Sequence, residues 1–126
     1  MKLIIAGSRN FDQFDIAWLT NILFQMELHP KNGLTEIVNG DCRGIDALGA
    51  NWAKSYGNGL TIKTFPPNWD KYGRGAGPVR NKEMANYGDE LLIIWDGKSK
   101  GSASMVKSMR ELGKPVHEVV LVSGKN

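Results

Sequence analysis

The feature of this sequence that most constrains its fold is a regular alternation of short apolar runs with longer segments of helical periodicity. Five apolar runs recur, at residues 2–6, 36–38, 60–65, 91–95 and 116–122. The fourth reads Leu-Leu-Ile-Ile-Trp without polar alternation, as expected of a strand buried on both faces of a parallel sheet. The fifth run is partly polar, which indicates an edge strand.

The segments between these runs carry the spacing of amphipathic helices. Apolar stripes extend over residues 14–26, 45–56, 79–87 and 105–112, and a glycine follows each of them. Trp18 and Trp52 lie on two of the stripes and are expected in the core. Strand–helix alternation through five strands predicts an α/β fold: one Rossmann-like open sheet of about five mostly parallel strands, flanked by helices.

Composition excludes several classes of protein. The chain has 126 residues, 41% of them hydrophobic and 23% charged, as in an ordinary single globular domain. Its single cysteine, Cys42, cannot form an internal disulfide or a cysteine-rich zinc module. No apolar run approaches the roughly 20 residues that span a bilayer, and residues 3–7 are too few for a signal-peptide core. We therefore expect one cytoplasmic domain over residues 1–126, without membrane contact.

Glycine, arginine and small polar residues are concentrated in the segments that follow the first four predicted strands. Four of the five arginines fall in or beside these segments: Arg9, Arg43, Arg74 and Arg80. Ligands of such sheets bind outside the carboxyl ends of the strands, where the strand order reverses. Glycine lets backbone N–H groups approach a ligand, and arginine binds phosphate or carboxylate through two hydrogen bonds. The net charge is only +3, but its placement predicts a site for an anionic ligand.

Standard motifs are missing. The segment from Gly7 to Arg9 lacks the second and third glycines of a dinucleotide-binding loop, and the chain has no P-loop motif. His29 and His117 lie outside the four loops, so we expect no catalytic triad and no metal site, and interpret both histidines as structural or solvated. No cofactor is predicted.

Several single residues allow two interpretations. Cys42 fits a small packed residue better than a reactive thiolate. Asp46 either favours the dipole of the helix that it begins or contacts the ligand. Trp69 and Tyr72 either stack on a base or clamp an irregular loop. Ser8 either binds phosphate or caps a turn.

Five segments of the chain carry a family resemblance: IIAGSR at residues 4–9, VNGDCRGID at 38–46, FPPNWDKYG at 65–73, AGPVRN at 76–81 and IWDGKSKG at 94–101. In this order and spacing they resemble the YspA-like family of the SLOG superfamily of Rossmann-like domains, which also contains DprA and the LOG phosphoribohydrolases. The resemblance covers residues 2–116. It implies a nucleotide or nucleotide-derived ligand, such as an ADP-ribose derivative or a cyclic nucleotide. Relatives sense or process such ligands, and many are encoded by bacteria, phages and mobile elements.

The expected ligand-binding residues come from the four loops and the helices that follow them. They are Gly7, Ser8, Arg9, Asn10, Gly40, Asp41, Arg43, Gly44, Asp46, Arg80, Asp96, Gly97, Lys98, Lys100, Gly101 and Ser102, with Trp69 and Tyr72 as candidates for base stacking. Residues 7–9 are expected to hold a phosphate, and residues 98–102 to form a second anion-binding loop. The carboxylates of Asp46 and Asp96 are expected to accept hydrogen bonds from a ribose or a base.

The chain departs from the family pattern at two places. Asp41 stands where the family usually has a second glycine, and its carboxylate would repel a nearby desolvated phosphate by roughly 1 kcal/mol or more. Either the anionic group lies nearer Arg43 and the other loops, or Asp41 accepts hydrogen bonds from a ribose. Secondly, the LOG enzymes have a catalytic glutamate where residues 103–105 of this chain read Ala-Ser-Met. No catalytic residue is therefore identified, although Asp46 or Asp96 remains as a substitute.

These observations favour a nucleotide-binding protein, with sequestration of a signalling nucleotide, as in a phage counter-defence, as one use. The alternatives are a LOG-like nucleotide hydrolase and a DprA-like protein that binds single-stranded DNA along the loop arginines. Many relatives self-associate, so we expect a homo-oligomer, with the long third loop as a candidate contact surface.

Overall fold

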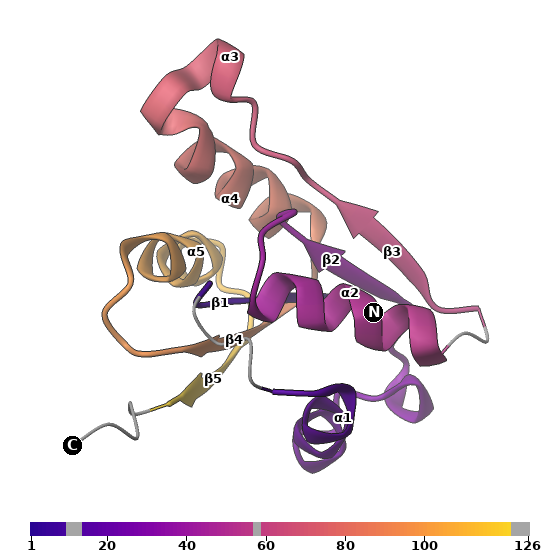
Figure 1. Cartoon of the computed structure of the whole chain (residues 1–126). Coiled ribbons are helices and arrows are strands. Elements are labelled where there is room, and N and C mark those ends of the chain that lie inside the picture. The colour runs from indigo at the N-terminus through magenta and orange to yellow at the C-terminus, as the bar shows by residue number, and fades with distance from the viewer. Residues whose placement is uncertain (10–13, 57–58, 122–126) are drawn as a thin grey trace.

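The structure, a computed structural model, describes residues 1–9, 14–56 and 59–121 and contains one five-stranded sheet. In chain order its elements are β1 (Lys2–Gly7), α1 (Ile16–Gln25), η1 (Pro30–Asn32), β2 (Glu36–Asn39), α2 (Ile45–Tyr56), β3 (Thr61–Thr64), α3 (Trp69–Tyr72), η2 (Gly73–Gly75), α4 (Ala76–Tyr87), β4 (Glu90–Trp95), α5 (Lys100–Glu111) and β5 (Val116–Val120). All four strand pairings are parallel, in the order β3-β2-β1-β4-β5 (Figure 1). The predicted α/β fold is confirmed, and β5 lies at an edge of the sheet as expected.

The strand order reverses at β1. The chain adds β2 and β3 on one side of β1 and then returns to add β4 and β5 on the other side. The register places Ile4 of β1 opposite Val38 of β2 and Ile5 of β1 opposite Leu92 of β4. The loops that follow β1 and β4 therefore diverge at the carboxyl edge of the sheet, where open α/β sheets bind their ligands.

Helices cover both faces of the sheet and form a core with each of them. One core joins α1 and α2 to the sheet, and the other joins α4 and α5 to its opposite face (Figure 1). Successive residues of β4 alternate between the two cores, because Leu92 and Ile94 lie in the first, while Ile93 and Trp95 lie in the second. This burial on both faces explains why the fourth apolar run of the sequence has no polar alternation.

The tryptophans of the two N-terminal helices differ in burial. Trp52 is buried, and its indole N–H donates a hydrogen bond to the Thr20 hydroxyl at 2.9 Å. Trp18 packs against the same core but is only partly buried, and its ring stacks on Phe14 at a centroid distance of 4.3 Å. The expectation of a core position thus holds fully for Trp52 and in part for Trp18.

The long third loop of the sequence contains more helix than its pattern indicates. Residues 69–75 form α3 and η2, and α4 begins at Ala76, three residues before the apolar stripe that predicts it. The side chain of Asn68 caps α3 by accepting the Lys71 N–H at 3.1 Å. A four-residue helix is too short to carry a periodic stripe, and Pro78 lies in the first turn of α4, where proline is tolerated. The helix predicted from residue 79 therefore starts too late, and residues 69–78 before it are already helical.

The helices are short. The longest ones that the structure describes, α2, α4 and α5, have 12 residues each. None of the helices in the described part of the chain is long and apolar enough to cross a membrane.

Candidate functional site

A cavity of about 330 Å³ lies at the carboxyl edge of the sheet, within the lower part of the range of ligand pockets, which is roughly 300–1,000 Å³. We call it the main cavity. Its lining comes from the end of β1, from the loops after β1, β2 and β4, and from α2, α4 and α5: Ala6, Gly7, Ser8, Arg9, Cys42, Arg43, Asp46, Arg80, Asn81, Met84, Asp96, Ser99, Gly101, Ser102 and Met105. Segments far apart in the sequence thus meet where the strand order reverses.

The structure brings together about half of the residues that the sequence nominates. Nine of them line the main cavity: Gly7, Ser8, Arg9, Arg43, Asp46, Arg80, Asp96, Gly101 and Ser102. Gly40, Asp41, Gly44, Trp69, Tyr72, Gly97, Lys98 and Lys100 do not line it, and Asn10 lies outside the described residues. Gly40 and Gly44 lie directly behind the lining, where they hold its side chains and backbone in place.

The backbone of Ser8 is fixed by two glycines, Gly7 at the end of β1 and Gly44 in the loop after β2. A Cβ on Gly7 would overlap the carbonyl oxygen of Ile94 in β4, so the two strand ends approach as closely as glycine allows. Gly44 has a φ of +77°, and it lets the Ile45 N–H donate to the Ser8 carbonyl at 3.4 Å. Ser8 in turn donates its own N–H to Ile94 at 3.1 Å. The start of α2 is thereby tied to the end of β1.

The hydroxyl of Ser8 has no hydrogen-bond partner among the described residues. Ser8 is only 7% exposed, and its Oγ is buried at the wall of the main cavity. A buried hydroxyl without a partner costs roughly 1–3 kcal/mol. Such a group in a cavity wall is typical of a site where a bound molecule supplies the missing hydrogen bond.

Arg80 connects the second loop to the main cavity. It is 8% exposed, and its Nη1 donates a hydrogen bond to the carbonyl of Gly40. Its Nε donates to Asn81 Oδ1 at 3.0 Å, and Asn81 Nδ2 donates to the Gly101 carbonyl at 3.2 Å. Through these two residues, α4 holds the turn after β2 and the start of α5 on opposite sides of the cavity.

Asp46 is a buried carboxyl group in the cavity wall. It is 5% exposed, and its Oδ2 accepts the Gly40 N–H at 3.0 Å. Burial raises its pKa to about 6, although the N–H groups of Gly40 and Gly7 and the positive charges of Arg80 and Arg9 act in the opposite direction. Asp46 can therefore hold or release a proton near neutral pH inside the cavity.

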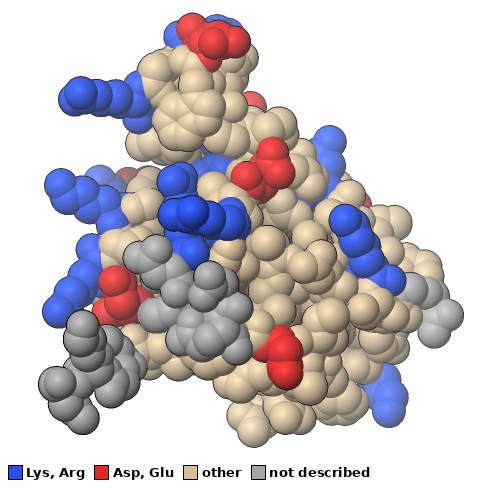
Figure 2. Space-filling model, viewed as in Figure 1, with Lys and Arg blue, Asp and Glu red and all other residues tan. Residues whose placement is uncertain are grey.

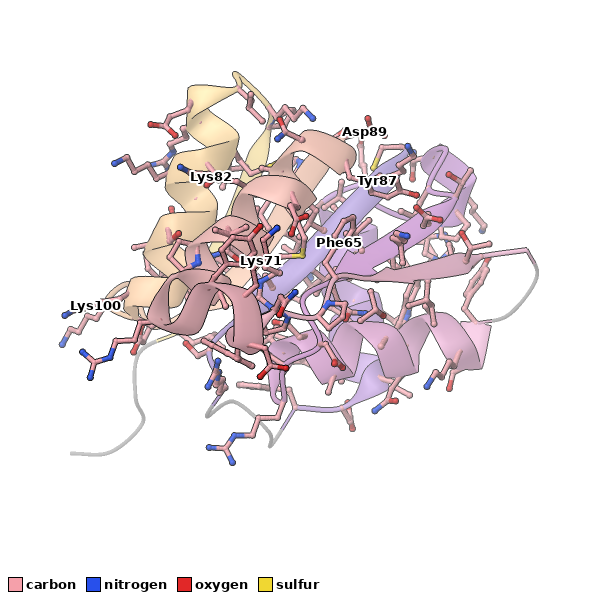
Figure 3. The ribbon with its side chains drawn as sticks, turned by 90° about the horizontal axis from the view of Figure 1, so that it is seen from above. Phe65, Lys71, Lys82, Tyr87, Asp89 and Lys100 are labelled. Carbon is pink, nitrogen blue, oxygen red and sulfur yellow. The ribbon has the colours of Figure 1, made fainter. Side chains whose placement is uncertain are left out.

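Asp96 organises its own loop. Its Oδ1 accepts the N–H groups of Lys98 at 2.8 Å and Ser99 at 2.9 Å, and these hydrogen bonds lower the pKa of the carboxyl group. Ser99 then caps α5 by accepting the Ser102 N–H. Lys98 and Lys100 are exposed, and Figure 3 shows Lys100 at the start of α5, projecting away from the molecule. Within residues 98–102, the cavity is therefore lined by Ser99, Gly101 and Ser102 and not by the two lysines.

A second, adjoining space lies outside the main cavity. This outer hollow is lined by Arg9, Asp41, Cys42, Arg43, Pro67 and Trp69 and has a volume of about 290 Å³. Asp41 has a φ of +61°, in the left-handed region that favours glycine. Glycine would adopt this backbone conformation without strain. Tyr72 lines neither the main cavity nor the outer hollow.

Cys42 is partly exposed and lies between two arginines, which the interpretation as a packed residue did not predict. Its Sγ is 3.9 Å from Arg9 Nη2 and 3.8 Å from Arg80 Nη1, and the residue lines both the main cavity and the outer hollow. Five further lining residues were not predicted from the sequence: Ala6, Asn81, Met84, Ser99 and Met105. Asn81 and Ser99 lie within motifs of the family resemblance, whereas the two methionines continue apolar core stripes and carry no local signal.

The histidines lie away from the main cavity. His29 is buried and caps η1, accepting the Lys31 N–H at 3.4 Å. His117 Nε2 contacts Glu90 Oε1 at 2.7 Å, between the neighbouring strands β5 and β4. Within the described ranges, no three His, Cys, Asp or Glu side chains are arranged to hold a metal ion.

The chain resembles a known phage protein over most of its length. It is 27% identical over 119 residues to the Gene 61 protein of Mycobacterium phage D29. The aligned region covers 91% of this chain and 93% of that protein. No solved structure matches it significantly. The model of the YspA, cpYpsA-related SLOG family matches residues 1–72, more than half of the chain, from β1 to α3. This match supports a role in binding or processing a nucleotide-related ligand. The chain belongs to the YspA, cpYpsA-related SLOG family.

Proposed function

We propose that this protein captures a nucleotide or nucleotide-derived ligand, such as an ADP-ribose derivative or a cyclic nucleotide, in the main cavity. The observation that carries the proposal is the buried hydroxyl of Ser8, which has no partner within the described residues and lies in the cavity wall. A phosphate or sugar hydroxyl of the ligand would satisfy it.

Two helices supply the electrostatic attraction. The first turns of α2 and α5, each helix 12 residues long, contribute Asp46 and the pair Gly101 and Ser102 to the cavity lining. Helix N-termini carry free N–H groups and roughly half a positive charge, which favour a bound anion. Arg80 adds a buried positive charge, while Arg9 and Arg43 add exposed ones. The phosphate of the ligand is therefore expected within reach of Ser8, Arg9 and Arg80.

Replacement of Ser8 separates this proposal from a purely structural role. Ser8→Ala removes an unsatisfied buried hydroxyl, so we expect the free energy of unfolding to rise by about 1 kcal/mol. We expect the same variant to bind its ligand roughly 10- to 150-fold more weakly, because it loses a hydrogen bond to a charged group. Denaturant unfolding measures the first effect. Calorimetry with AMP, cyclic AMP and ADP-ribose measures the second.

Ser108→Ala is the matched control. Ser108 is a buried serine of α5 that does not line the main cavity, so its replacement should leave affinity unchanged. A Ser8→Ala variant that keeps full affinity for the nucleotides bound by the unmodified chain would exclude Ser8 from the site.

A second candidate function, cleavage of the ligand, is favoured by Asp46. A buried carboxyl with a pKa of about 6 in a ligand cavity is suited to general acid–base catalysis. In this reaction water would add across the N-glycosidic bond, giving a free base and a sugar with a new hydroxyl group. Chromatography of the ligand after incubation distinguishes the two functions. Intact ligand supports capture, whereas free base that disappears with Asp46→Asn supports cleavage.

Sequestration of a signalling nucleotide in the cytoplasm is the biological use that we propose for capture. It requires tight binding and recovery of the intact ligand. Self-association is a separate proposal, and light scattering of the chain with and without nucleotide tests it.

A further inference from the structure

We infer that the ligand is a two-part molecule, with a phosphorylated sugar in the main cavity and a planar ring stacked on Trp69 in the outer hollow. This inference rests on the proposed function and names the class of ligand more narrowly. The molecule is a nucleotide whose base and second sugar lie at the two ends of a phosphate bridge, rather than a mononucleotide.

The two spaces adjoin each other and share part of their lining. Arg9, Cys42 and Arg43 line both the main cavity, of about 330 Å³, and the outer hollow, of about 290 Å³. Taken alone, each is at or just below the small end of pockets that enclose drug-sized ligands. A ligand that fills both must pass over the three shared residues. Since two of these are arginines, the part of the ligand that crosses between the spaces is expected to be anionic, as a phosphate bridge is.

Trp69 is presented to solvent on a fixed support. Its side chain is 53% exposed, whereas Trp52 and Trp95 are buried in the two cores. It begins α3, whose first turn is held by the side chain of Asn68, and Pro67 before it lines the same hollow. A residue that clamps its loop would be buried against that loop, so this exposure disfavours the clamp interpretation. An exposed indole beside arginines is a typical stacking surface for a base.

The charge of Asp41 sets the direction of the ligand. Asp41 lines the outer hollow but not the main cavity, so the hollow that Trp69 lines also contains a carboxylate. A phosphate in the outer hollow would be repelled by this carboxylate. The amino group of a base or the hydroxyl of its ribose would instead donate a hydrogen bond to it. The ring is therefore assigned to the outer hollow and the phosphorylated sugar to the main cavity.

Calorimetry with three probes tests the inference on the full chain: ADP-ribose, AMP and ribose 5-phosphate. We expect ADP-ribose to bind most tightly, because it alone can fill both spaces. Trp69→Ala should weaken ADP-ribose binding roughly 10- to 100-fold, the range that stacking on one base implies. The same substitution should leave ribose 5-phosphate binding within about twofold, and Trp69→Phe should keep most of the affinity because phenylalanine also stacks.

Tyr72 offers a matched control on the same short helix. It is 41% exposed, with Lys71 Nζ 5.1 Å from its ring centroid, and it lines neither space. Tyr72→Ala should therefore leave the affinity for ADP-ribose unchanged. ADP-ribose should also quench tryptophan fluorescence in the unmodified chain, and this quenching should be lost in Trp69→Phe although binding is retained.

The outcomes separate this inference from the proposed function. If ADP-ribose binds and Trp69→Ala does not weaken it, or if AMP binds as tightly as ADP-ribose, the two-part ligand is wrong while capture in the main cavity stands. If none of the three probes binds the unmodified chain at millimolar concentration while cyclic AMP does, the two-part ligand is wrong and capture stands; if cyclic AMP does not bind either, both proposals are overturned.

Discussion

At the scale of single residues, Asp46 couples the protonation of the cavity to the stability of the fold. Its pKa is about 6 in the folded chain, because burial disfavours the charged carboxylate, and near 3.8 in a solvent-exposed chain. Between these two values the folded state binds a proton that the unfolded state does not. The free energy of unfolding should therefore rise as the pH falls from about 7 to about 5.

The Asp46→Asn variant measures this contribution, because asparagine keeps an oxygen for the Gly40 N–H but does not titrate in this range. Denaturant unfolding of both chains at about pH 7.5 and about pH 5 gives the change in the free energy of unfolding with pH for each chain. The difference between the two changes is the contribution of Asp46. We expect the unmodified chain to gain more stability on acidification than the variant. Equal gains in the two chains would mean that Asp46 does not have a raised pKa.

Asp41 has a strained backbone conformation. Its φ of +61° costs a residue with a Cβ about 1 kcal/mol, somewhat less for aspartate than for most side chains. Asp41→Gly should therefore raise the free energy of unfolding by up to about 1 kcal/mol, while Asp41→Asn, which also tolerates this conformation, should change it little. Denaturant unfolding of both variants checks these values. A loss of stability in Asp41→Gly would contradict the strain argument.

At the scale of elements, the contact between the ends of β1 and β4 depends on one glycine. A methyl group on Gly7 would overlap the Ile94 carbonyl, which is backbone and cannot rotate away. Gly7→Ala should therefore destabilise the fold by several kcal/mol or prevent folding. Thermal unfolding with circular dichroism measures the change.

Gly101 is the matched control for Gly7. It also lines the main cavity, but a Cβ there would meet no atom within 4 Å. Because Gly101 lies in α5, Gly101→Ala should keep or raise the stability, by up to about 1 kcal/mol. If both variants unfold at the same temperature as the unmodified chain, the close approach of β1 and β4 is not rigid.

The element order and sheet direction could be predicted from the sequence because they depend on local patterns. The uninterrupted apolar run of β4 indicated a strand that is buried on both faces, and both faces are covered. The location of the cavity followed from the same argument, since glycines and arginines cluster after strands whose carboxyl ends share an edge. The contacts within the cavity could not be predicted. Arg80 reaches the Gly40 carbonyl across 40 positions of sequence, and Asn81 reaches Gly101 through the packing of α4 beside α5.

At the scale of the whole molecule, a net charge of +3 is distributed unevenly. Three arginines meet at the main cavity, and Figure 2 shows Lys and Arg side chains grouped below the α3 end of the molecule. Figure 3 shows Tyr87, the last residue of α4, and Asp89 on the opposite side of the molecule from Lys100. The positive charge that faces a ligand therefore comes from these arginines at the carboxyl edge of the sheet, and not from the net charge of the whole chain.

This local charge leads to a prediction about salt. A small anion in the main cavity interacts with the buried Arg80, which salt screens weakly, so its affinity should fall less than about fivefold between about 0.05 and 0.2 M salt. A single-stranded oligonucleotide would contact the exposed arginines and lysines, and each phosphate that it pairs adds to the salt slope. Its binding should weaken by more than about tenfold over the same range. Titrations of ADP-ribose and of an oligonucleotide at both salt concentrations measure the two slopes. Oligonucleotide binding with a steep slope, together with no nucleotide binding at either concentration, would replace capture of a small ligand with binding of single-stranded DNA.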